Sequence, residues 1–550
     1  MSFFDAVVSG FKNCFVFRGR SSRSEFWWFF LFSIMACLIA LNFSFENLNK
    51  ELSKSDINDV SSVLRTLLSS WFGVALLITY VPQIALSVRR FHDINKSGWW
   101  FFSIKSGIIC TGIEPIPPEN WLEDGLANSP IKFTSKDGNH CSKNASIEDD
   151  LNLLDFALLN QTPFYLYSEK TILNNYNSYV DSFANHDHLI CYSVKANSNL
   201  SILSLLAKLN SGFDIVSAGE LLRVIEAGGD PSKTVFSGVG KTEDEIRLAL
   251  EKNIMCFNIE SLEELATINK IALEHNTVAN ISIRVNPSID AKTHPYITTG
   301  LKDNKFGIDE SEVINAYKEA SKLKGLNIFG IDFHIGSQIM DVAPYKDSLL
   351  KIIKIINELK KLNINITHID IGGGLGISYT GEKAPSKTEF VKSLTDALKT
   401  LNLKIIIEPG RSIVGNSGLL VTKVINVKST PTKKFIIVDA GMNDFIRPPL
   451  YDAYHSIKEI FLSDIEKFKC DVVGPICETT DFFGKDRLLG ASKGDFLVIE
   501  DTGAYGSVFA SNYNTRPKIA EYLVKGNNAV LIKSRETVEN ILANEKSLLK

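Results

Sequence analysis

Short apolar runs alternate with longer amphipathic stretches between about residues 189 and 408. The apolar runs fall near 189–195, 213–217, 234–237, 255–259, 281–285, 328–334, 366–371 and 404–408. The stretches between them show the apolar spacing of helices over 199–210, 218–228, 242–253, 261–275, 309–324, 345–362 and 387–401. Eight strands that alternate with helices predict an α/β fold with a closed parallel (β/α)₈ barrel, although periodicity alone leaves an open doubly wound sheet as an alternative.

The pattern changes after about residue 415. Short β-like runs at 419–422, 435–438, 471–473 and 496–499 are separated by turn residues, which predicts a C-terminal β domain. We therefore expect the barrel over residues 151–415 and the β domain over 416–550. Residues 106–150 lack clear periodicity and are interpreted as a linker and the start of the β domain.

Two uncharged stretches of membrane-spanning length lie near the N-terminus, at 26–43 and 71–88. Basic residues flank them on the outer sides, at Arg18, Arg20, Arg23, Arg89, Arg90 and Lys96. This pattern predicts two transmembrane helices in the inner membrane, with the N-terminus and the C-terminal bulk of the chain in the cytoplasm. A pair of buried core helices is the alternative, and it would leave the protein cytoplasmic.

Composition excludes several classes of partner. The formal net charge of −4 and the near balance of Lys+Arg (59) and Asp+Glu (63) argue against nucleic acid. The eight cysteines contain no CxxC pair, which argues against a zinc site and against a disulfide framework. We therefore expect no metal and a reducing compartment.

Polar or reactive residues end nearly every predicted strand of the barrel, where the catalytic groups of such barrels gather. They are Lys195, Ser217, Ser237, Asn258, Arg284, His334, Gly372 and Glu408. Lys195 follows an apolar run, and burial there would lower its pKa and favour a Schiff base with a carbonyl cofactor.

Other motifs fit a pyridine ring that carries a phosphate. The cluster Gly372, Gly373 and Gly374 lets backbone N–H groups approach a phosphate, although a tight turn without a ligand is the alternative. Glu408 would keep a pyridine nitrogen protonated, unless it forms a buried ion pair with Arg411.

Two further residues are candidates on weaker grounds. His334 would stack on the ring while the nearby Ser337 binds the phosphate. Cys477 would donate a proton, with a structural role as its alternative.

The N-terminal motifs resemble the DUF805 family of small bacterial inner-membrane proteins. They span residues 17–28, 88–93 and 97–100, and the resemblance covers about residues 1–105. That family continues into further hydrophobic segments, whereas this chain turns polar at Lys105. The resemblance therefore implies a truncated membrane module.

Residues from about 150 to 545 resemble the fold-type III pyridoxal-phosphate decarboxylases, with an alanine-racemase-type barrel, and within them most closely the meso-diaminopimelate decarboxylase family. The matching stretches are 192–197, 334–338, 370–376, 408–411, 447–451, 477–478 and 501–506.

The resemblance implies a role for each of these residues. Lys195 would hold pyridoxal 5′-phosphate covalently, and Cys477 would be the proton donor. The other cofactor-binding residues would be His334, Ser337, Gly372, Gly373, Gly374, Glu408, Pro409, Gly410, Arg411 and Tyr505. The substrate would contact Arg411, Arg447, Tyr451, Glu478 and Tyr505. In this family Cys477 and its neighbours reach the site from the other subunit, which implies a homodimer with shared active sites.

The distal end of the substrate decides between related enzymes. Arg447 and Arg411 suit a carboxylate, and Glu478 suits an ammonium, so diaminopimelate fits better than ornithine, arginine or carboxynorspermidine. The expected reaction is its decarboxylation to L-lysine. The sequence also leaves open a racemase of the same barrel class and a catalytically inactive, membrane-bound regulatory protein.

Overall fold

The computed structural model describes residues 151–184, 186–289, 304–460 and 465–549. The predicted membrane spans at 26–43 and 71–88 and the segment 106–150 lie outside these ranges. Within the described ranges, no helix combines the length and the apolar character needed to cross a membrane.

Eight parallel strands form a closed barrel in the part of the chain that the structure describes. They are β2 (His188–Ser193), β3 (Gly212–Ile215), β4 (Thr234–Phe236), β5 (Cys256–Ile259), β6 (Ala279–Asn286), β8 (Leu326–Asp332), β9 (His368–Asp370) and β10 (Lys404–Ile407). The order β5-β4-β3-β2-β10-β9-β8-β6 closes through the pairing of β5 with β6, and the short β7 (Ile308–Asp309) pairs with β6. All eight predicted strands are confirmed, and closure excludes the open doubly wound sheet.

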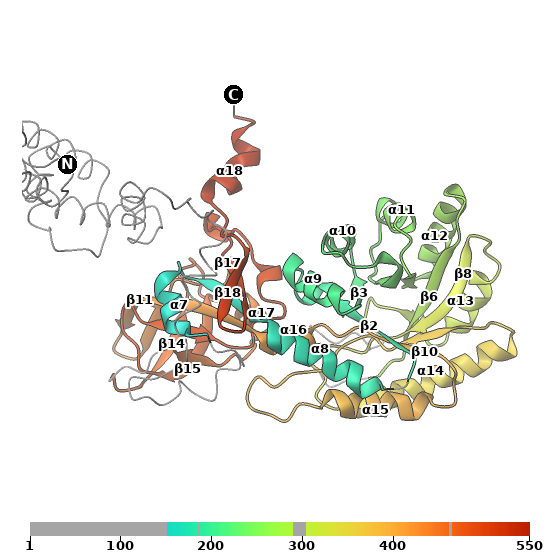
Figure 1. The fold of residues 1–550 in the computed structure, drawn as a ribbon, viewed down its shortest axis with the longest axis horizontal. Coiled ribbons are helices and arrows are strands. Elements are labelled where there is room, and N and C mark those ends of the chain that lie inside the picture. The colour runs from blue at the N-terminus through green and yellow to red at the C-terminus, as the bar shows by residue number, and fades with distance from the viewer. Residues whose placement is uncertain (1–150, 185, 290–303, 461–464, 550) are drawn as a thin grey trace, which may run out of the picture. The chain divides into compact units, whose positions relative to one another are not determined.

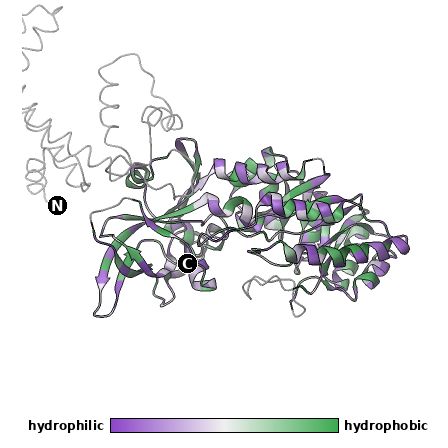
Figure 2. Cartoon of the chain, turned by 90° about the horizontal axis from the view of Figure 1, so that it is seen from below, coloured by the Kyte–Doolittle hydropathy of each residue, from purple (hydrophilic) through white to green (hydrophobic). Residues whose placement is uncertain are grey.

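Helices surround the barrel strands (Figure 1). They are α8 (Glu169–Phe183), α9 (Leu200–Lys208), α10 (Ala218–Glu226), α11 (Glu243–Glu251), α12 (Leu262–Glu274), α13 (Val313–Ala320), α14 (Ala343–Lys361) and α15 (Lys387–Leu398). Figure 2 shows hydrophilic and hydrophobic residues alternating along these helices, as expected for helices with one buried face. Hydroxyl N-caps fix several starts, and Thr242 and Glu245 form a reciprocal capping box on α11.

A second sheet collects strands from both ends of the described chain. Its main order is β15-β14-β12-β11-β1-β17-β18, with β13 and β16 attached beside β11. The strands are β1 (Phe164–Ser168), β11 (Gly418–Ser429), β12 (Lys434–Val438), β13 (Ile457–Glu459), β14 (Phe468–Val473), β15 (Phe482–Leu489), β16 (Phe496–Ile499), β17 (Ala520–Lys525) and β18 (Asn528–Lys533). The four β-like runs predicted after residue 415 are therefore confirmed.

Strand β1 precedes the barrel in sequence but belongs to this second sheet. It pairs antiparallel with β11 and parallel with β17. The range expected for the barrel thus begins with a stretch that crosses into the β domain. Because both partners of β1 follow the barrel in the chain, the apolar run 164–168 by itself gives no hint of this pairing.

Several short elements complete the described chain. They are α7 (Leu153–Leu159), η1 (Val194–Ala196), η2 (Pro231–Lys233), α16 (Arg411–Val414), η4 (Gly415–Ser417), α17 (Arg447–Tyr451), η5 (Ser507–Phe509), η6 (Tyr513–Thr515) and α18 (Val538–Lys546). Three of them, η1, α16 and α17, carry Lys195, Arg411 and Arg447. The segments that leave the barrel strands and those of the β domain therefore meet around these three cations.

Candidate active site

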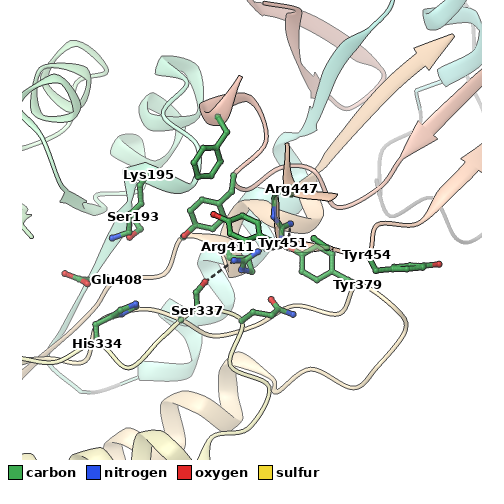
Figure 3. Close-up of a pocket in the computed structure, with 16 residues that line it drawn as sticks. Ser193, Lys195, His334, Ser337, Tyr379, Glu408, Arg411, Arg447, Tyr451 and Tyr454 are labelled. Carbon is green, nitrogen blue, oxygen red and sulfur yellow. Dashed lines mark hydrogen bonds between the residues drawn. The ribbon is translucent and has the colours of Figure 1, made fainter. Parts of the chain in front are cut away.

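A cavity of about 370 Å³ lies at the carboxyl ends of the barrel strands. The barrel contributes Ser193, Lys195, His334, Ser337, Gln338, Gly374, Tyr379, Glu408, Gly410 and Arg411. The β domain contributes Arg447, Tyr451, Ala453, Tyr454, Tyr505 and Phe509. Figure 3 shows Lys195, Glu408 and His334 on one side and Arg411, Arg447 and Tyr379 on the other. One end of the pocket therefore holds an amine and a buried carboxyl group, and the other end is strongly basic.

Lys195 lies just past the end of β2 and points its amine toward a buried carboxylate. Its Nζ lies 2.7 Å from Oδ2 of Asp214, which also accepts a 2.5 Å hydrogen bond from Ser193 Oγ. Burial lowers the pKa of Lys195, but the carboxylates of Asp214 and Glu408 raise it by more, so its pKa lies above the ordinary lysine value. The expectation that burial leaves this pKa lowered was wrong, because the sequence does not reveal the two nearby acids.

Glu408 follows β10 and lies among other carboxylates. One oxygen from each of Asp332, Asp370 and Glu408 falls within 4.8 Å of the others. Burial first, and then the neighbouring carboxylates, hold the pKa of Glu408 well above its ordinary range. An ion pair between Glu408 and Arg411 does not occur among the described residues, so that alternative is excluded.

Three of the polar strand ends support this acidic group. Ser237 Oγ and Asn258 Nδ2 both donate to Oε1 of Glu408, at 3.4 and 3.3 Å. Arg284 lies farther along the barrel wall, with its Nη1 2.6 Å from Glu260 and its Nε 3.9 Å from Asp332. These side chains therefore hold buried acids in place, and none of the three lines the pocket.

His334 is held as a neutral ring by the glycine cluster. The backbone N–H of Gly373 donates to His334 Nδ1 at 3.0 Å, so this nitrogen carries no hydrogen. Burial, with help from the charges of Arg284 and Lys195, lowers the pKa of His334 well below its ordinary value. A neutral imidazole therefore faces the pocket.

At Gly373 and Gly374 a neighbouring backbone segment passes so close that no side chain fits. A Cβ on Gly373 would lie 2.1 Å from the carbonyl oxygen of Glu408, and one on Gly374 would lie 2.2 Å from that of Gly336. Gly374 also has a φ of +102°, a conformation that favours glycine. Gly374 lines the pocket, whereas Gly372, Gly373 and Pro409 do not.

The basic end of the pocket converges on one hydroxyl. Tyr379 Oη accepts from Nη1 of Arg411 at 2.8 Å and from Nη1 of Arg447 at 2.9 Å. Arg411 Nη2 also donates to Ser337 Oγ at 3.0 Å, and its guanidinium lies 4.8 Å from the ring centre of Tyr505. Sequence reasoning missed Tyr379, although its place seven residues after the start of the glycine cluster was a usable signal.

His455 was missed as well, and no sequence signal pointed to it. Its Nε2 lies 3.0 Å from Nη1 of Arg447, and its Nδ1 lies 2.8 Å from the carbonyl oxygen of Glu500. The ring is fully buried. His455 therefore supports Arg447 from behind the pocket.

Cys477 and Glu478 do not line this pocket. Both are exposed, on the loop between β14 and β15. Asn514 Oδ1 accepts from the Cys477 backbone N–H at 3.3 Å, and the Tyr513 hydroxyl donates to Glu478 Oε1 at 2.5 Å. Their side chains are thus held at the surface of the described chain, apart from the residues that surround Lys195.

Comparison with known proteins shows the family to which the chain belongs. A family model described as the pyridoxal-binding domain of pyridoxal-dependent decarboxylases matches residues 169–415. The diaminopimelate decarboxylase of Vibrio cholerae is 49% identical over 401 residues, which make up 73% of this chain and 96% of that protein. The chain belongs to the diaminopimelate decarboxylase family.

Solved structures of diaminopimelate decarboxylases agree with this assignment. The Helicobacter pylori enzyme complexed with L-lysine is 47% identical, has a TM-score of 0.70, and is covered over 100% of its length by 72% of this chain. The M. jannaschii enzyme in complex with L-lysine is 38% identical with a TM-score of 0.69, over 95% of its length and 72% of this chain. A second family model, a protein of unknown function (DUF805), matches residues 14–131, which confirms the N-terminal resemblance and extends it past residue 105.

The pocket fits pyridoxal phosphate, the cofactor of diaminopimelate decarboxylases. Lys195 would supply an amine for its aldehyde, and Glu408 would supply a buried carboxyl group for its ring nitrogen. Gly374 lines the pocket, and with the donors of Ser337 and Arg411 it would suit a phosphate; the buried Nε of Arg411 has no hydrogen-bond partner among the described residues. His334 would lie against the ring.

Proposed function

We propose that the chain decarboxylates meso-2,6-diaminopimelate to L-lysine and carbon dioxide, the last step of lysine biosynthesis. The observation that carries this proposal is the division of charge within the pocket. An amine and a buried acid occupy one end, while two guanidinium groups occupy the other. This layout suits a cofactor with a basic ring nitrogen and a substrate with a second carboxylate.

The residues around Lys195 prepare the reaction. Bound pyridoxal phosphate supplies a ring that accepts the electrons left behind when carbon dioxide departs. Glu408 holds a proton on the side of the ring nitrogen, and the raised pKa of this carboxyl favours a shared proton there. Asp214 holds a proton on Lys195 Nζ. The protein thus contributes orientation and placed charge.

Arg447 and Tyr451 bind the distal carboxylate of the substrate. Both residues belong to α17 and line the basic end of the pocket. A guanidinium presents paired N–H donors that match the two oxygens of a carboxylate. Ornithine has no distal carboxylate, so an enzyme for ornithine would gain nothing from Arg447.

Cys477 and Glu478 act in the pocket of a second copy of the chain. Their exposure on the β14–β15 loop, away from their own Lys195, supports this assignment. Cys477 Sγ donates a proton to the carbon that has lost carbon dioxide, and Glu478 binds the distal ammonium. Each active site is then complete only in a homodimer.

Mixing inactive variants tests this shared site. Lys195→Ala and Cys477→Ala dimers are each expected to be inactive. If subunits exchange at random in an equal mixture, half of the dimers are mixed, and each carries one native site. About a quarter of the wild-type activity should then return, whereas sites built within one chain would give none.

The N-terminal module tethers the enzyme to the inner face of the cytoplasmic membrane. The apolar stretches 26–43 and 71–88 with basic flanks support this, as does the DUF805 match over residues 14–131. Fractionation of cells that express the full chain tests it. Activity in the membrane pellet is expected, and it should move to the supernatant when residues 1–105 are deleted.

A substrate panel tests the proposed reaction. Carbon dioxide release is measured with the full chain in detergent, loaded with pyridoxal phosphate, on meso-diaminopimelate, ornithine, arginine and carboxynorspermidine. Release from meso-diaminopimelate alone is expected. Release from one of the other amines would overturn the substrate assignment. Bound cofactor without any release would favour a catalytically inactive regulatory protein.

A further inference from the structure

Arg447 is a buried cation whose described hydrogen bonds go to neutral groups. Only 7% of the residue is exposed. Its Nη1 donates to the Tyr379 hydroxyl at 2.9 Å and to His455 Nε2 at 3.0 Å, and no ion pair to Arg447 occurs among the described residues. Burial lowers its pKa, and the nearby Arg411 charge acts in the same direction. A buried guanidinium in this state favours an anionic ligand.

The hydrogen bonds of His455 fix its protonation. Its Nδ1 lies 2.8 Å from the carbonyl oxygen of Glu500, which only accepts, so Nδ1 carries the hydrogen. Its Nε2 faces Nη1 of Arg447, which only donates, so Nε2 carries none. His455 is therefore neutral, in a single tautomer. Edge contacts with Tyr379 and Phe445, at ring-centre distances of 5.0 and 4.8 Å, hold the ring in this orientation.

Tyr379 connects the two arginines of the pocket. Its oxygen accepts from Arg411 at 2.8 Å and from Arg447 at 2.9 Å, and its ring centre lies 5.0 Å from the Arg447 guanidinium carbon. Without a shared acceptor, two like charges so close together would repel each other and turn apart. Tyr379 therefore sets the spacing between Arg411, which is assigned to the phosphate, and Arg447.

We propose that Tyr379 and His455 are positioning residues that hold Arg447 ready for the distal carboxylate of the substrate. They make the pocket selective for amines that carry this carboxylate. The inference rests on the proposed function, because it takes Arg447 as the carboxylate-binding group. Neither side chain needs to touch the reacting atoms, and His455 acts only through Arg447.

Two amines that differ only in this carboxylate provide the test. L-Lysine has the distal carboxylate, and 1,5-diaminopentane lacks it. Their dissociation constants are measured on the full chain loaded with pyridoxal phosphate, by competition with meso-diaminopimelate. The dissociation constant of 1,5-diaminopentane divided by that of L-lysine reports how well Arg447 is placed. This ratio falls when L-lysine binding is lost selectively, and it does not change when both amines are weakened equally.

The expected result is a selective loss. In Tyr379→Phe and His455→Phe the dissociation constant of L-lysine should rise by about tenfold, as expected for one charge-assisted hydrogen bond. That of 1,5-diaminopentane should change by less than about twofold. The KM for meso-diaminopimelate should rise, while kcat should change by less than about twofold. His455→Gln, which keeps an acceptor and a donor, should recover part of the selectivity.

Three controls separate the ways in which the proposal can fail. Tyr522→Phe removes a hydroxyl of the second sheet that donates to Asn160, and its ratio should match the wild type. If Arg447→Met lowers the ratio but Tyr379→Phe and both His455 variants do not, the positioning role is wrong and the proposed function stands. If Arg447→Met itself leaves the ratio unchanged, the substrate assignment is wrong. Equal weakening of both amines in the Tyr379 and His455 variants would show a merely structural role.

Discussion

The Nζ atom of Lys195 lies 2.7 Å from Oδ2 of Asp214, which is fully buried at the end of β3. The same oxygen accepts from Ser193, while Oδ1 has no hydrogen-bond partner in the described chain. The carboxylate therefore stabilises the ammonium form of Lys195 strongly. An amine attacks a carbonyl only in its neutral form, so Asp214 regulates when Lys195 reacts.

Replacing Asp214 by Asn should lower the pKa of Lys195, because the main charge that opposes its deprotonation is removed. The uptake of pyridoxal phosphate by the cofactor-free protein should then become faster at pH 7 and reach its plateau at a lower pH. Absorbance stopped-flow across a pH series measures this. Ser193→Ala is the control, since it removes the other hydrogen bond of the same oxygen and leaves the charge. An unchanged pH midpoint in Asp214→Asn would contradict the prediction.

Glu408→Gln should lower the activity and raise the stability of the fold. A neutral amide does not hold a proton for the ring nitrogen, so kcat should fall by about 10²- to 10³-fold. The same change removes one of several crowded carboxylates, so the free energy of unfolding of the cofactor-free protein should rise by roughly 1–2 kcal/mol at pH 8. Steady-state kinetics and urea unfolding measure the two effects.

Asp332→Asn is the matched control for Glu408. It relieves the same crowding, because its carboxylate lies within 4.8 Å of that of Glu408, but it does not line the pocket. Stability should rise with a much smaller loss of kcat. A similar kcat loss in both variants would show that the acidic group acts as a unit and that Glu408 has no special role.

Asp444 should make the fold less stable as the pH rises. Burial raises its pKa from 3.8 to about 7. Between these values the folded protein keeps a proton that the unfolded chain has lost, so stability is full below about pH 4 and declines up to about pH 7. The decline attributable to this group is about 4 kcal/mol at most.

Urea unfolding of wild type and Asp444→Asn at pH 5 and pH 8 measures this. The variant keeps an oxygen for the Gly441 N–H, which donates to Asp444 at 3.0 Å, and it cannot ionise. Its stability should change less between the two pH values. Because Asp501 and Glu220 also have pKa values raised to about 7, mainly by burial, only the difference between wild type and variant reports Asp444. Equal pH dependence in both proteins would exclude this role.

Gly373→Ala should weaken cofactor binding. Its Cβ would lie 2.1 Å from the backbone oxygen of Glu408, so either the glycine loop or the strand end must move. Gly376→Ala is the milder control, because its Cβ would meet the flexible Met340 side chain at 2.6 Å, which is able to turn away, while the nearest backbone atom, the Ile339 oxygen, lies 3.1 Å away. Fluorescence titration with pyridoxal phosphate should show a loss of at least about tenfold in affinity for Gly373→Ala only. Normal binding of pyridoxal phosphate by Gly373→Ala would contradict the role of the glycine cluster in cofactor binding.

Much of the barrel was predictable because its signal is local. Each strand is an apolar run of a few residues, and each helix repeats its apolar face every three to four positions. Lys195 and Glu408 were found as candidates for the same reason, since they stand at the ends of such runs, whereas Arg411 was found through the family resemblance. Strand β1 was not placed, because its pairing partners β11 and β17 lie more than two hundred residues away along the chain.

The sequence by itself determined the eight strands and the helices that alternate with them, the β-rich C-terminal part, and the kinds of chemical group that follow each strand. Only the tertiary structure decided how these groups act on one another. It placed Asp214 against Lys195 and so reversed the expected direction of the lysine pKa, and it brought Tyr379 and His455 to Arg447. The physical reason is that periodicity reports which face of an element is buried, whereas charge interactions and hydrogen bonds depend on distances between residues far apart in the chain.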